Sequence, residues 1–485
     1  MSTLETWVID INDVFWTYLL IPLVAVAGIW FTLRSKGAQL RLVPDMFRVF
    51  KDKTTSGVSP FGAFTISAAA RIGTGNIAGV ATAITMGGPG AVFWMWMMAL
   101  IGGASAFVES VLAQLYKVRG REAGTYRGGP AYYMERALGK RWLGVVFAVL
   151  ITLTFGFVLT AVQSNTITVA TKGSLDTDAA WFAPALGIVL AVLLGLSVFF
   201  GVKHLTKVTK VLIPAMAGLY IVMGLLVVVL NLGSIPGMLA DIIGGAFGFR
   251  EIAGGAVGTA ILQGVRRGMF SNEAGMGSAP NASAAAETTH PVKQGLVQTL
   301  GVYFDTLVIC TVTAFVILSA NPELGTRGGA DVTQSAFSGA LGDWAGHLLT
   351  FVVFMVAFSS MIGNYYYGES NIEFITRSKA AMTSYRMVVL ACAVLGAVGS
   401  VPLVWSLADV TMGAMVLVNL LAILPLSVIA FRLLDDYQAQ RRAGLDPVFT
   451  VDRVPGLRGV SVWGADASTT DSADAAHEKV SAASR

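Results

Sequence analysis

Charged residues are scarce in this chain. Of its 485 residues only 13% are Asp, Glu, Lys or Arg, whereas about a quarter are charged in an ordinary soluble domain. Hydrophobic residues make up 55%, and they recur in runs of about 20, the length that a helix needs to cross a bilayer. Each run is continuously apolar instead of alternating, which argues against a β-barrel. The composition excludes a soluble domain and predicts an all-α integral membrane protein.

Cysteine and histidine are also rare. The two cysteines, Cys310 and Cys392, both lie inside apolar runs, where a free thiol usually packs between helices. Neither belongs to a zinc or redox pattern. The four histidines show no metal-ligand spacing and no arrangement typical of a hydrolase triad. The sequence therefore predicts a protein that is not an enzyme.

Nucleotide-binding motifs are missing as well. The stretch GTGNIAG at 73–79 is not a GxGxxG that follows a strand, and GxxxxGK[ST] does not occur. The net charge of +4 is modest and indicates no nucleic-acid partner. We expect no organic cofactor.

Eleven apolar runs are long enough to be membrane spans, and we number them 0 to 10 because the first stands apart from the rest. They lie at about 14–33, 60–86, 88–116, 143–170, 183–202, 208–232, 254–286, 294–320, 345–375, 385–401 and 405–432. Basic residues gather on every second loop, as with Arg34 and Lys36 after segment 0 and Lys117 and Arg119 after segment 2. Cytoplasmic loops are enriched in Lys and Arg. The pattern predicts a multi-pass plasma-membrane protein with its N-terminus outside and its C-terminus in the cytoplasm.

Two further segments flank the spans. Residues 40–53 mix apolar and basic residues at helical spacing, which fits either an interfacial helix or a basic linker. From about Asp446 the chain turns polar and rich in Ala, Ser and Asp, a composition typical of a disordered tail. We therefore divide the chain into an N-terminal helix and linker (1–59), two membrane units (60–232 and 233–432) and a cytoplasmic tail (433–485).

Segments 1 and 6 contain glycine-rich polar stretches, RIGTGNIAG at 71–79 and FSNEAGMGSAP at 270–280. Each interior glycine destabilises a helix by about 1 kcal/mol relative to alanine, and open backbone at membrane depth is tolerated only inside protein or beside a water-filled cavity. Both segments are predicted to be discontinuous. Each opens a group of five spans, and the two groups start in opposite orientations, which is typical of a transporter with a five-plus-five inverted repeat.

The open backbone suggests which ligands it binds. Amide groups near Thr74 and Gly75 begin the outer half of segment 1 and suit a carboxylate, while unpaired carbonyls around 69–72 suit a cation or an ammonium group. Together they fit a zwitterionic amino acid and a small cation.

Other polar residues lie at membrane depth, where interhelical hydrogen bonding is the simpler explanation. Six uncharged residues and one acid are candidates for a functional role: Gln163, Asn165, Asp305, Ser359, Ser360, Asn364 and Asn419. Five charged residues either pair among themselves to hold the broken helices or handle ligand or protons: Arg71, Glu109, Arg266, Arg267 and Glu273.

Four motifs together resemble the alanine or glycine:cation symporter family, whose members are similar to the leucine-transporter fold. They are RIGTGNIAGVATAITMGGPGAVFWMW, GVRRGMFSNEAGMGSAP, AVQSN and NYYYGES. The resemblance covers roughly residues 14 to 435. It implies sodium-driven uptake of alanine or glycine through ten core helices preceded by one extra helix.

The resemblance also implies a set of site residues. Sodium would be held by the carbonyls of Ala69, Ile72 and Val356 and the hydroxyls of Ser359 and Ser360. The substrate carboxylate would meet Thr74, Gly75 and Asn76, and its ammonium group the break in segment 6. Residues expected around the rest of the substrate are Gln163, Phe270, Ser271, Asn272, Ala274, Met276, Ser360, Asn364 and Tyr366. Asn364 departs from the tryptophan that many members carry there, which weakens the expected restriction to alanine and glycine.

We therefore predict a sodium-coupled symporter for small neutral amino acids, surrounded by membrane lipid. The sequence indicates no oligomeric state. Proton coupling through Glu273 or Glu109 is one alternative. The other is a membrane sensor of amino acids that does not transport, although the tail contains no recognisable signalling domain.

Overall fold

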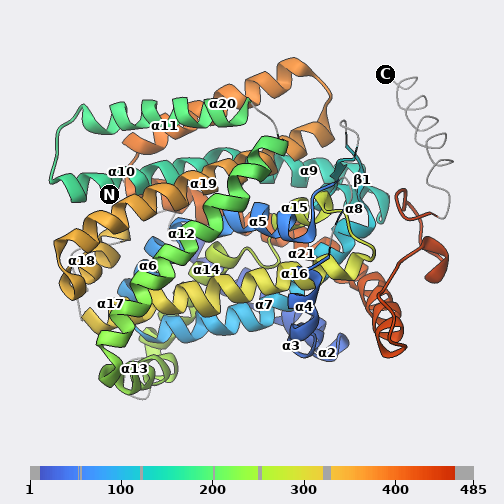
Figure 1. The fold of residues 1–485 in the computed structure, drawn as a ribbon, viewed down its shortest axis with the longest axis horizontal. Coiled ribbons are helices and arrows are strands. Elements are labelled where there is room, and N and C mark those ends of the chain that lie inside the picture. Colours follow the sequence, from blue (N-terminus) through green and yellow to red (C-terminus); the bar gives the residue numbers. More distant parts are fainter. Residues whose placement is uncertain are drawn as a thin grey trace.

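The computed structural model describes residues 11–52, 54, 57–120, 124–199, 202–248, 254–320 and 329–464. Nearly all of the described chain is helical (Figure 1). Its one sheet in these ranges is a small antiparallel pair, β1 (Val118–Arg119) and β2 (Tyr126–Arg127). The prediction of an all-α membrane protein agrees with this architecture.

Seven helical stretches of the described residues are long and apolar enough to cross a membrane. They are Ile11–Arg34, which contains η1 (Trp16–Leu20) and α2 (Ile21–Arg34); α7 (Gly90–Leu115); Arg141–Leu175, made of α9 (Arg141–Ile151), η3 (Thr152–Leu159) and α10 (Thr160–Leu175); Pro291–Ala320, made of α16 (Pro291–Tyr303), η5 (Phe304–Cys310) and α17 (Thr311–Ala320); α19 (Asp343–Ile375); α20 (Lys379–Val398); and α21 (Val401–Arg442). These match predicted segments 0, 2, 3, 7, 8, 9 and 10.

An eighth span is reached only if a bent pair is counted as one. In this pair the part of α12 (Val202–Leu230) from Pro214 onward turns by 75° into Leu232–Phe247, which holds η4 (Leu232–Ser234) and α13 (Ile235–Phe247). Predicted segment 4 is α11 (Phe182–Val198), a shorter apolar helix. The count of eleven spans remains a prediction, because segments 1 and 6 fall on interrupted helices.

Segment 1 is divided among α5 (Pro60–Arg71), η2 (Gly75–Gly79) and α6 (Val80–Gly87). Ser59 caps the start of α5 by accepting a hydrogen bond from the N–H group of Gly62. The helix ends because Ile72 adopts an extended conformation, with φ −73° and ψ 90°.

Segment 6 is divided between α14 (Gly254–Asn272) and α15 (Ala279–Ala285). The residues between them include Gly275 and Gly277, with φ of 77° and 84°. A side chain is strained in this left-handed region, so glycine suits both positions. Between 272 and 279 the backbone therefore lacks regular helical bonding.

Shorter helices lie between the long ones. They are α3 (Ala38–Arg41), α4 (Val43–Val49), α8 (Pro130–Arg136), α18 (Ala330–Leu341) and η6 (Val451–Arg453). Helices α3 and α4 cover most of the stretch at 40–53. Its position at the membrane surface stays a prediction.

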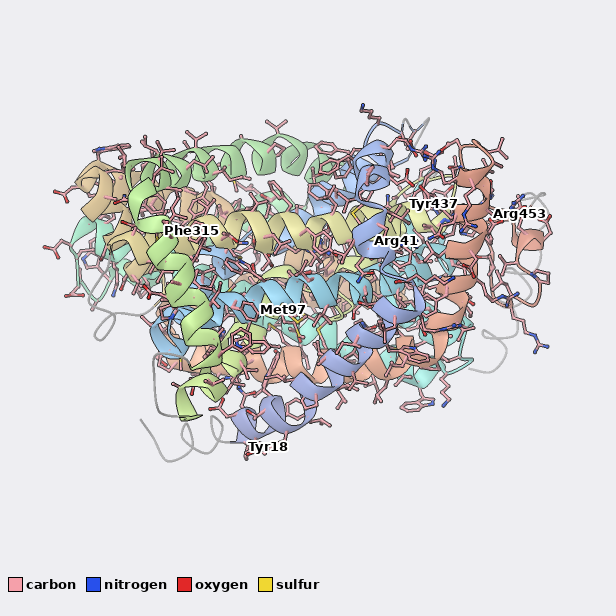
Figure 2. All side chains as sticks on the ribbon, turned by 90° about the horizontal axis from the view of Figure 1, so that it is seen from below. Tyr18, Arg41, Met97, Phe315, Tyr437 and Arg453 are labelled. Carbon is pink, nitrogen blue, oxygen red and sulfur yellow. The ribbon has the colours of Figure 1, made fainter. Side chains whose placement is uncertain are left out.

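Helix α5 lies at the centre of the molecule and contacts α12, α15 and α19 (Figure 1). Helix α7 packs along both α14 and α16, while α11 and α20 form a pair at one edge. Figure 2 places Arg41, Tyr437 and Arg453 toward one end of the bundle and Phe315 toward the other. The two helix breaks thus lie where several long helices meet.

The predicted disordered tail differs from the structure over its first part. Helix α21 continues to Arg442, and the chain then folds back as a C-terminal strap (residues 445–464). The N–H group of Phe449 donates to the carbonyl of Thr289 at 2.9 Å, and Nε1 of Trp463 donates to the carbonyl of Gln114 at 3.0 Å. Both aromatic side chains are buried. A few apolar anchors order a segment whose average composition is polar. Residues 465–485 lie outside the described residues.

Candidate functional site at the helix breaks

The end of α5 meets the middle of α19. The hydroxyl of Ser360 donates to the carbonyl of Ile72 at 3.2 Å and to that of Val356 at 3.1 Å, and the hydroxyl of Ser359 donates to the carbonyl of Val356 at 2.8 Å. Ala69, one turn before Ile72, is buried in the same cluster as Ile72 and Val356. The structure thus brings the five predicted sodium-site residues into one buried region.

This meeting requires glycine. A Cβ atom on Gly73 would lie 2.4 Å from Oγ of Ser360 and 3.2 Å from Nε2 of Gln163, and one on Gly363 would lie 2.8 Å from the backbone nitrogen of Ala70. No real side chain fits at the shorter of these distances. The backbone of α19 therefore approaches the backbone of α5 directly.

The oxygen atoms gathered here are carbonyl and hydroxyl oxygens. Such hard, neutral ligands suit a small hard cation, and each hydroxyl can rotate its proton away from the carbonyls to offer a lone pair. Ile72, Val356, Ser359 and Ser360 supply these oxygen atoms. The chemistry of this donor set fits sodium.

On the other side of the break, two amide side chains accept hydrogen bonds from the open backbone. The N–H group of Gly73 donates to Oδ1 of Asn76 at 3.1 Å, and that of Thr74 donates to Oε1 of Gln163 at 3.3 Å. Gly75 faces α14: a Cβ there would lie 3.0 Å from Phe270. Asn76 and Gln163 thus satisfy two N–H groups that the end of α5 leaves open.

Asn76 also belongs to a buried network around Asp305 of η5. Its Nδ2 donates to Oδ1 of Asp305 at 2.7 Å and to Oγ of Ser271 at 3.0 Å, and Ser271 donates to Oδ2 of Asp305 at 2.7 Å. Thr306 adds a hydrogen bond to the same carboxylate and accepts one from Asn272. The sequence marked Asp305 only as an acid inside an apolar run. It did not indicate that Asp305 accepts hydrogen bonds from Asn76 and Ser271.

The break in segment 6 is held by Glu109 of α7. The N–H groups of Gly275 and Gly277 donate to its two carboxylate oxygens at 3.2 and 3.1 Å, and Asn419 of α21 donates to it at 2.7 Å. These hydrogen bonds satisfy backbone groups that the helix leaves open. Glu109 thereby fixes the path of the chain between α14 and α15.

The other predicted substrate-site residues have varied surroundings. The ring of Phe270 stacks on Trp405 with centroids 4.8 Å apart. Ala274 lies against Gly102 of α7. Met276, two residues further along the chain, is buried. The hydroxyl of Tyr366 donates to the carbonyl of Asn281 at 3.5 Å. In these contacts Ala274 and Tyr366 face neighbouring helices and not the break in segment 1.

The charged residues do not pair as one set. Arg266 binds Asp13 at 2.7 Å and Arg267 binds Asp409 at 2.5 Å, so the acids that neutralise them come from the ends of the chain. Glu273 accepts from Ser278 at 2.6 Å. Nη1 of Arg71 donates to the carbonyl of Gln298 at 3.3 Å. The expectation that the five charged residues pair among themselves is therefore wrong for Arg266 and Arg267.

A small cavity lies beside the break in segment 1. It is lined by Ile72, Gly73, Asn76, Ile77, Ala217, Tyr220, Ile309 and Val356. Three of these residues were predicted to bind ligand or ion. The sequence did not predict the lining residues Ala217 and Tyr220 of α12 and Ile309 of η5. Nothing in an apolar run indicates which side of the helix faces a cavity.

A search against known families and proteins gives a consistent result. The family model for the sodium:alanine symporter family matches residues 1–451. Among relatives, the probable sodium/glutamine symporter GlnT of Bacillus subtilis is 50% identical and covers 95% of this chain and 96% of its own. The amino-acid carrier protein AlsT of the same organism is 49% identical, covering 93% and 96%.

A more distant relative is the sodium/alanine symporter AgcS of Methanococcus maripaludis, which is 38% identical and covers 86% of this chain and 93% of its own. Among solved structures, MhsT in complex with L-phenylalanine superposes with a TM-score of 0.56 at 14% identity, covering 83% of this chain and 95% of that one. At this identity the likeness shows the fold, which is leucine-transporter-like.

These matches extend over almost the whole chain, and the matched proteins are transporters, not enzymes. Several apolar helices together with such relatives make this a multi-pass plasma-membrane protein. The chain belongs to the sodium:alanine symporter family.

Proposed function

We propose that this protein imports small neutral amino acids, alanine and glycine among them, by sodium-coupled symport with alternating access. The observation that carries the proposal is the buried group of oxygens where Ser359 and Ser360 of α19 meet the carbonyls of Ile72 and Val356. This group borders the cavity at the break in α5, so an ion and a substrate bound there would lie side by side.

Sodium is assigned to Ala69, Ile72, Val356, Ser359 and Ser360. Binding of the ion would draw α5 and α19 together, because its ligands come from both helices. That links the ion to the geometry of the break in which the substrate binds.

The substrate carboxylate is assigned to Thr74, Gly75 and the side chain of Asn76. It would take the place of Gln163 and Asn76 as acceptor for the open N–H groups, which releases those two side chains. The ammonium group is assigned to the acceptors at 270–272, beside the network of Asp305, and Gln163 adds a polar contact. Size selection is assigned to Phe270, which lies against Gly75, and not to Ala274 or Tyr366, which face neighbouring helices.

The proposed architecture has eleven spans, with residues 60–232 and 233–432 as inverted repeats whose first members are discontinuous. The end of α5 at Arg71 and the end of α14 at Asn272 support corresponding breaks. The alternation of basic loops supports an outside N-terminus and a cytoplasmic C-terminus.

Proton coupling through Glu109 or Glu273 is the competing mechanism. Glu109 accepts bonds from two backbone amides and Asn419, and such engagement favours a structural role. A non-transporting sensor lacks support, because the relatives named above are transporters or carriers.

The deciding experiment is uptake of labelled alanine into proteoliposomes with and without an inward sodium gradient. Accumulation should require the gradient and should stop when choline replaces sodium at fixed pH. Accumulation that persists in choline and follows a proton gradient would support the competing mechanism. No gradient-dependent accumulation of any neutral amino acid would end the proposal.

Glutamine is a second candidate substrate. A relative that is 50% identical is named a probable sodium/glutamine symporter, and the departure from tryptophan at Asn364 leaves a polar side chain beside the assigned site.

A further inference from the structure

Asn364 stands out among the buried amides of α19. Its side chain is 1% exposed, and neither Oδ1 nor Nδ2 has a hydrogen-bond partner in the described part of the chain. Asn165 and Asn419 are just as deeply buried, and each donates two hydrogen bonds. Buried polar groups are normally satisfied, so an amide with both atoms open needs an explanation.

The position of Asn364 connects it with the assigned site. It follows Ser360 by four residues, so the two side chains lie on the same face of α19 one turn apart. Between them is Gly363, where α19 comes closest to the backbone of Ala70. Asn364 therefore lies one helical turn, about 5.4 Å, beyond the point where Ser360 meets the break.

An open amide offers one donor and one acceptor in a plane. The group that complements it in both respects is another carboxamide, which donates from its nitrogen to Oδ1 and accepts at its oxygen from Nδ2. A methyl group, as in alanine, leaves both atoms of Asn364 unpaired. The two methylenes of glutamine carry its carboxamide roughly one helical turn from the α-carbon, whereas asparagine is shorter by one methylene.

We propose that Asn364 determines specificity by pairing its carboxamide with the side-chain carboxamide of a glutamine substrate whose α-carboxylate and ammonium group bind at the break in segment 1. This rests on the proposed function, because it uses the same substrate site. Tyr367, one heptad after Ser360, also has a buried hydroxyl without a partner among the described residues. It leaves a second polar group on the same face of α19 for the outer side of the carboxamide.

The experiment measures sodium-driven uptake of labelled glutamine and labelled alanine in proteoliposomes, each over a range of concentrations. The variants are Asn364→Leu, which keeps the branched shape and removes both polar atoms, and Asn364→Asp, which keeps the acceptor and removes the donor. Asn231→Leu is the control, since Asn231 makes only a local bond to the carbonyl of Val227 at the end of α12.

We expect Asn364→Leu to lower kcat/KM for glutamine by about 10- to 100-fold while kcat/KM for alanine falls by less than about threefold. Asn364→Asp should lose glutamine uptake to a similar degree and Asn231→Leu should change neither substrate. Because alanine uptake reports a folded transporter in each variant, a misfolded protein is recognised at once.

Two results would overturn the inference and leave the proposed function standing: wild-type protein that accumulates alanine but not glutamine, or an Asn364→Leu variant in which both substrates fall equally. Failure of the wild-type protein to accumulate either amino acid under a sodium gradient would end both.

Discussion

The hydroxyl of Ser360 and the carbonyl of Ile72 lie 3.2 Å apart although 288 residues separate them in the chain. Both are buried. Their contact joins the end of α5 to α19 at the place where α5 loses its helical bonding, so the open carbonyl of Ile72 has a partner from another helix. A cation between these helices would take over that role, and this makes Ser360 the sharpest test of the assigned ion site.

Ser360→Ala should raise the sodium concentration needed for half-maximal uptake by about tenfold, because one lost hydrogen-bonding oxygen is worth about 1–3 kcal/mol. Initial rates of alanine uptake against sodium concentration measure this. Ser427→Ala is the control, since the hydroxyl of Ser427 bonds only to the carbonyl of Leu424 in its own helix. An unchanged sodium dependence in Ser360→Ala would count against the assigned ion site.

Gly73→Ala tests the close approach of the two helices. The added methyl group would lie 2.4 Å from Oγ of Ser360, so α5 and α19 must separate, and we expect loss of sodium-dependent uptake by at least about tenfold. Gly218→Ala on α12 is matched in chemistry but adds its methyl group to open space. It should transport as the wild type does. Equal uptake by the two variants would show that the tight contact at Gly73 is dispensable.

Part of this site could be predicted from the sequence because it is local. Glycines at 73 and 75 and the polar stretch at 270–280 indicated helix interruptions, since such residues are rare inside apolar runs. The adjacent serines 359 and 360 carried a family pattern. Each of these signals lies within a dozen residues, where composition and motif are informative.

The partners of these residues could not be predicted, because tertiary packing decides them. Arg267 lies six residues before Glu273 yet pairs with Asp409, 142 positions away. The role of Asp305 depends on Asn76 and Ser271 reaching it from two other helices. In the C-terminal strap, Phe449 and Trp463 are too few to change the average composition, but their contacts are enough to order the backbone.

The pair Arg267 and Asp409 is expected to stabilise the protein only as a pair. The two side chains are 4% and 5% exposed and 2.5 Å apart. Asp409→Asn removes the negative charge and leaves Arg267 buried without it, at a cost of about 3–5 kcal/mol. Thermal unfolding in detergent should show a clear fall in the midpoint.

The double variant Arg267→Met with Asp409→Leu is the matching control. It removes both charges together, and replacing a buried pair by apolar residues is often neutral or stabilising. Its midpoint should therefore lie above that of Asp409→Asn. A double variant as unstable as the single one would mean that packing at these positions matters more than charge.

His290 gives the protein a pH dependence at the start of α16. Its Nδ1 accepts from the N–H group of Val292 at 3.2 Å, and its Nε2 faces Asp436 at 3.2 Å. The rings of Tyr437 and Phe449 flank it. The pKa of His290 is lowered from 6.5 to about 4, chiefly by burial. The positive charges of Lys293 and Arg453 add to the lowering, and Asp436 opposes it.

The direction of the effect follows from proton uptake. Between pH 6.5 and about 4 the unfolded chain binds a proton at this histidine and the folded protein does not, so the free energy of unfolding falls as the pH falls through that window. Above pH 6.5 the contribution is constant. The full loss is about 3 kcal/mol, from 1.36 kcal/mol for each unit of pKa.

His290→Asn should remove this dependence and keep the helix start, because asparagine is a favoured N-cap. Unfolding midpoints of the wild type and the variant, measured from neutral pH down through this window, should converge as the pH falls, since only the wild type loses stability through His290. Comparing the two proteins at each pH cancels the contribution of all other acids. Parallel curves would mean that His290 is protonated equally in the folded and unfolded states, and that burial and the hydrogen bond from Val292 do not hold it neutral.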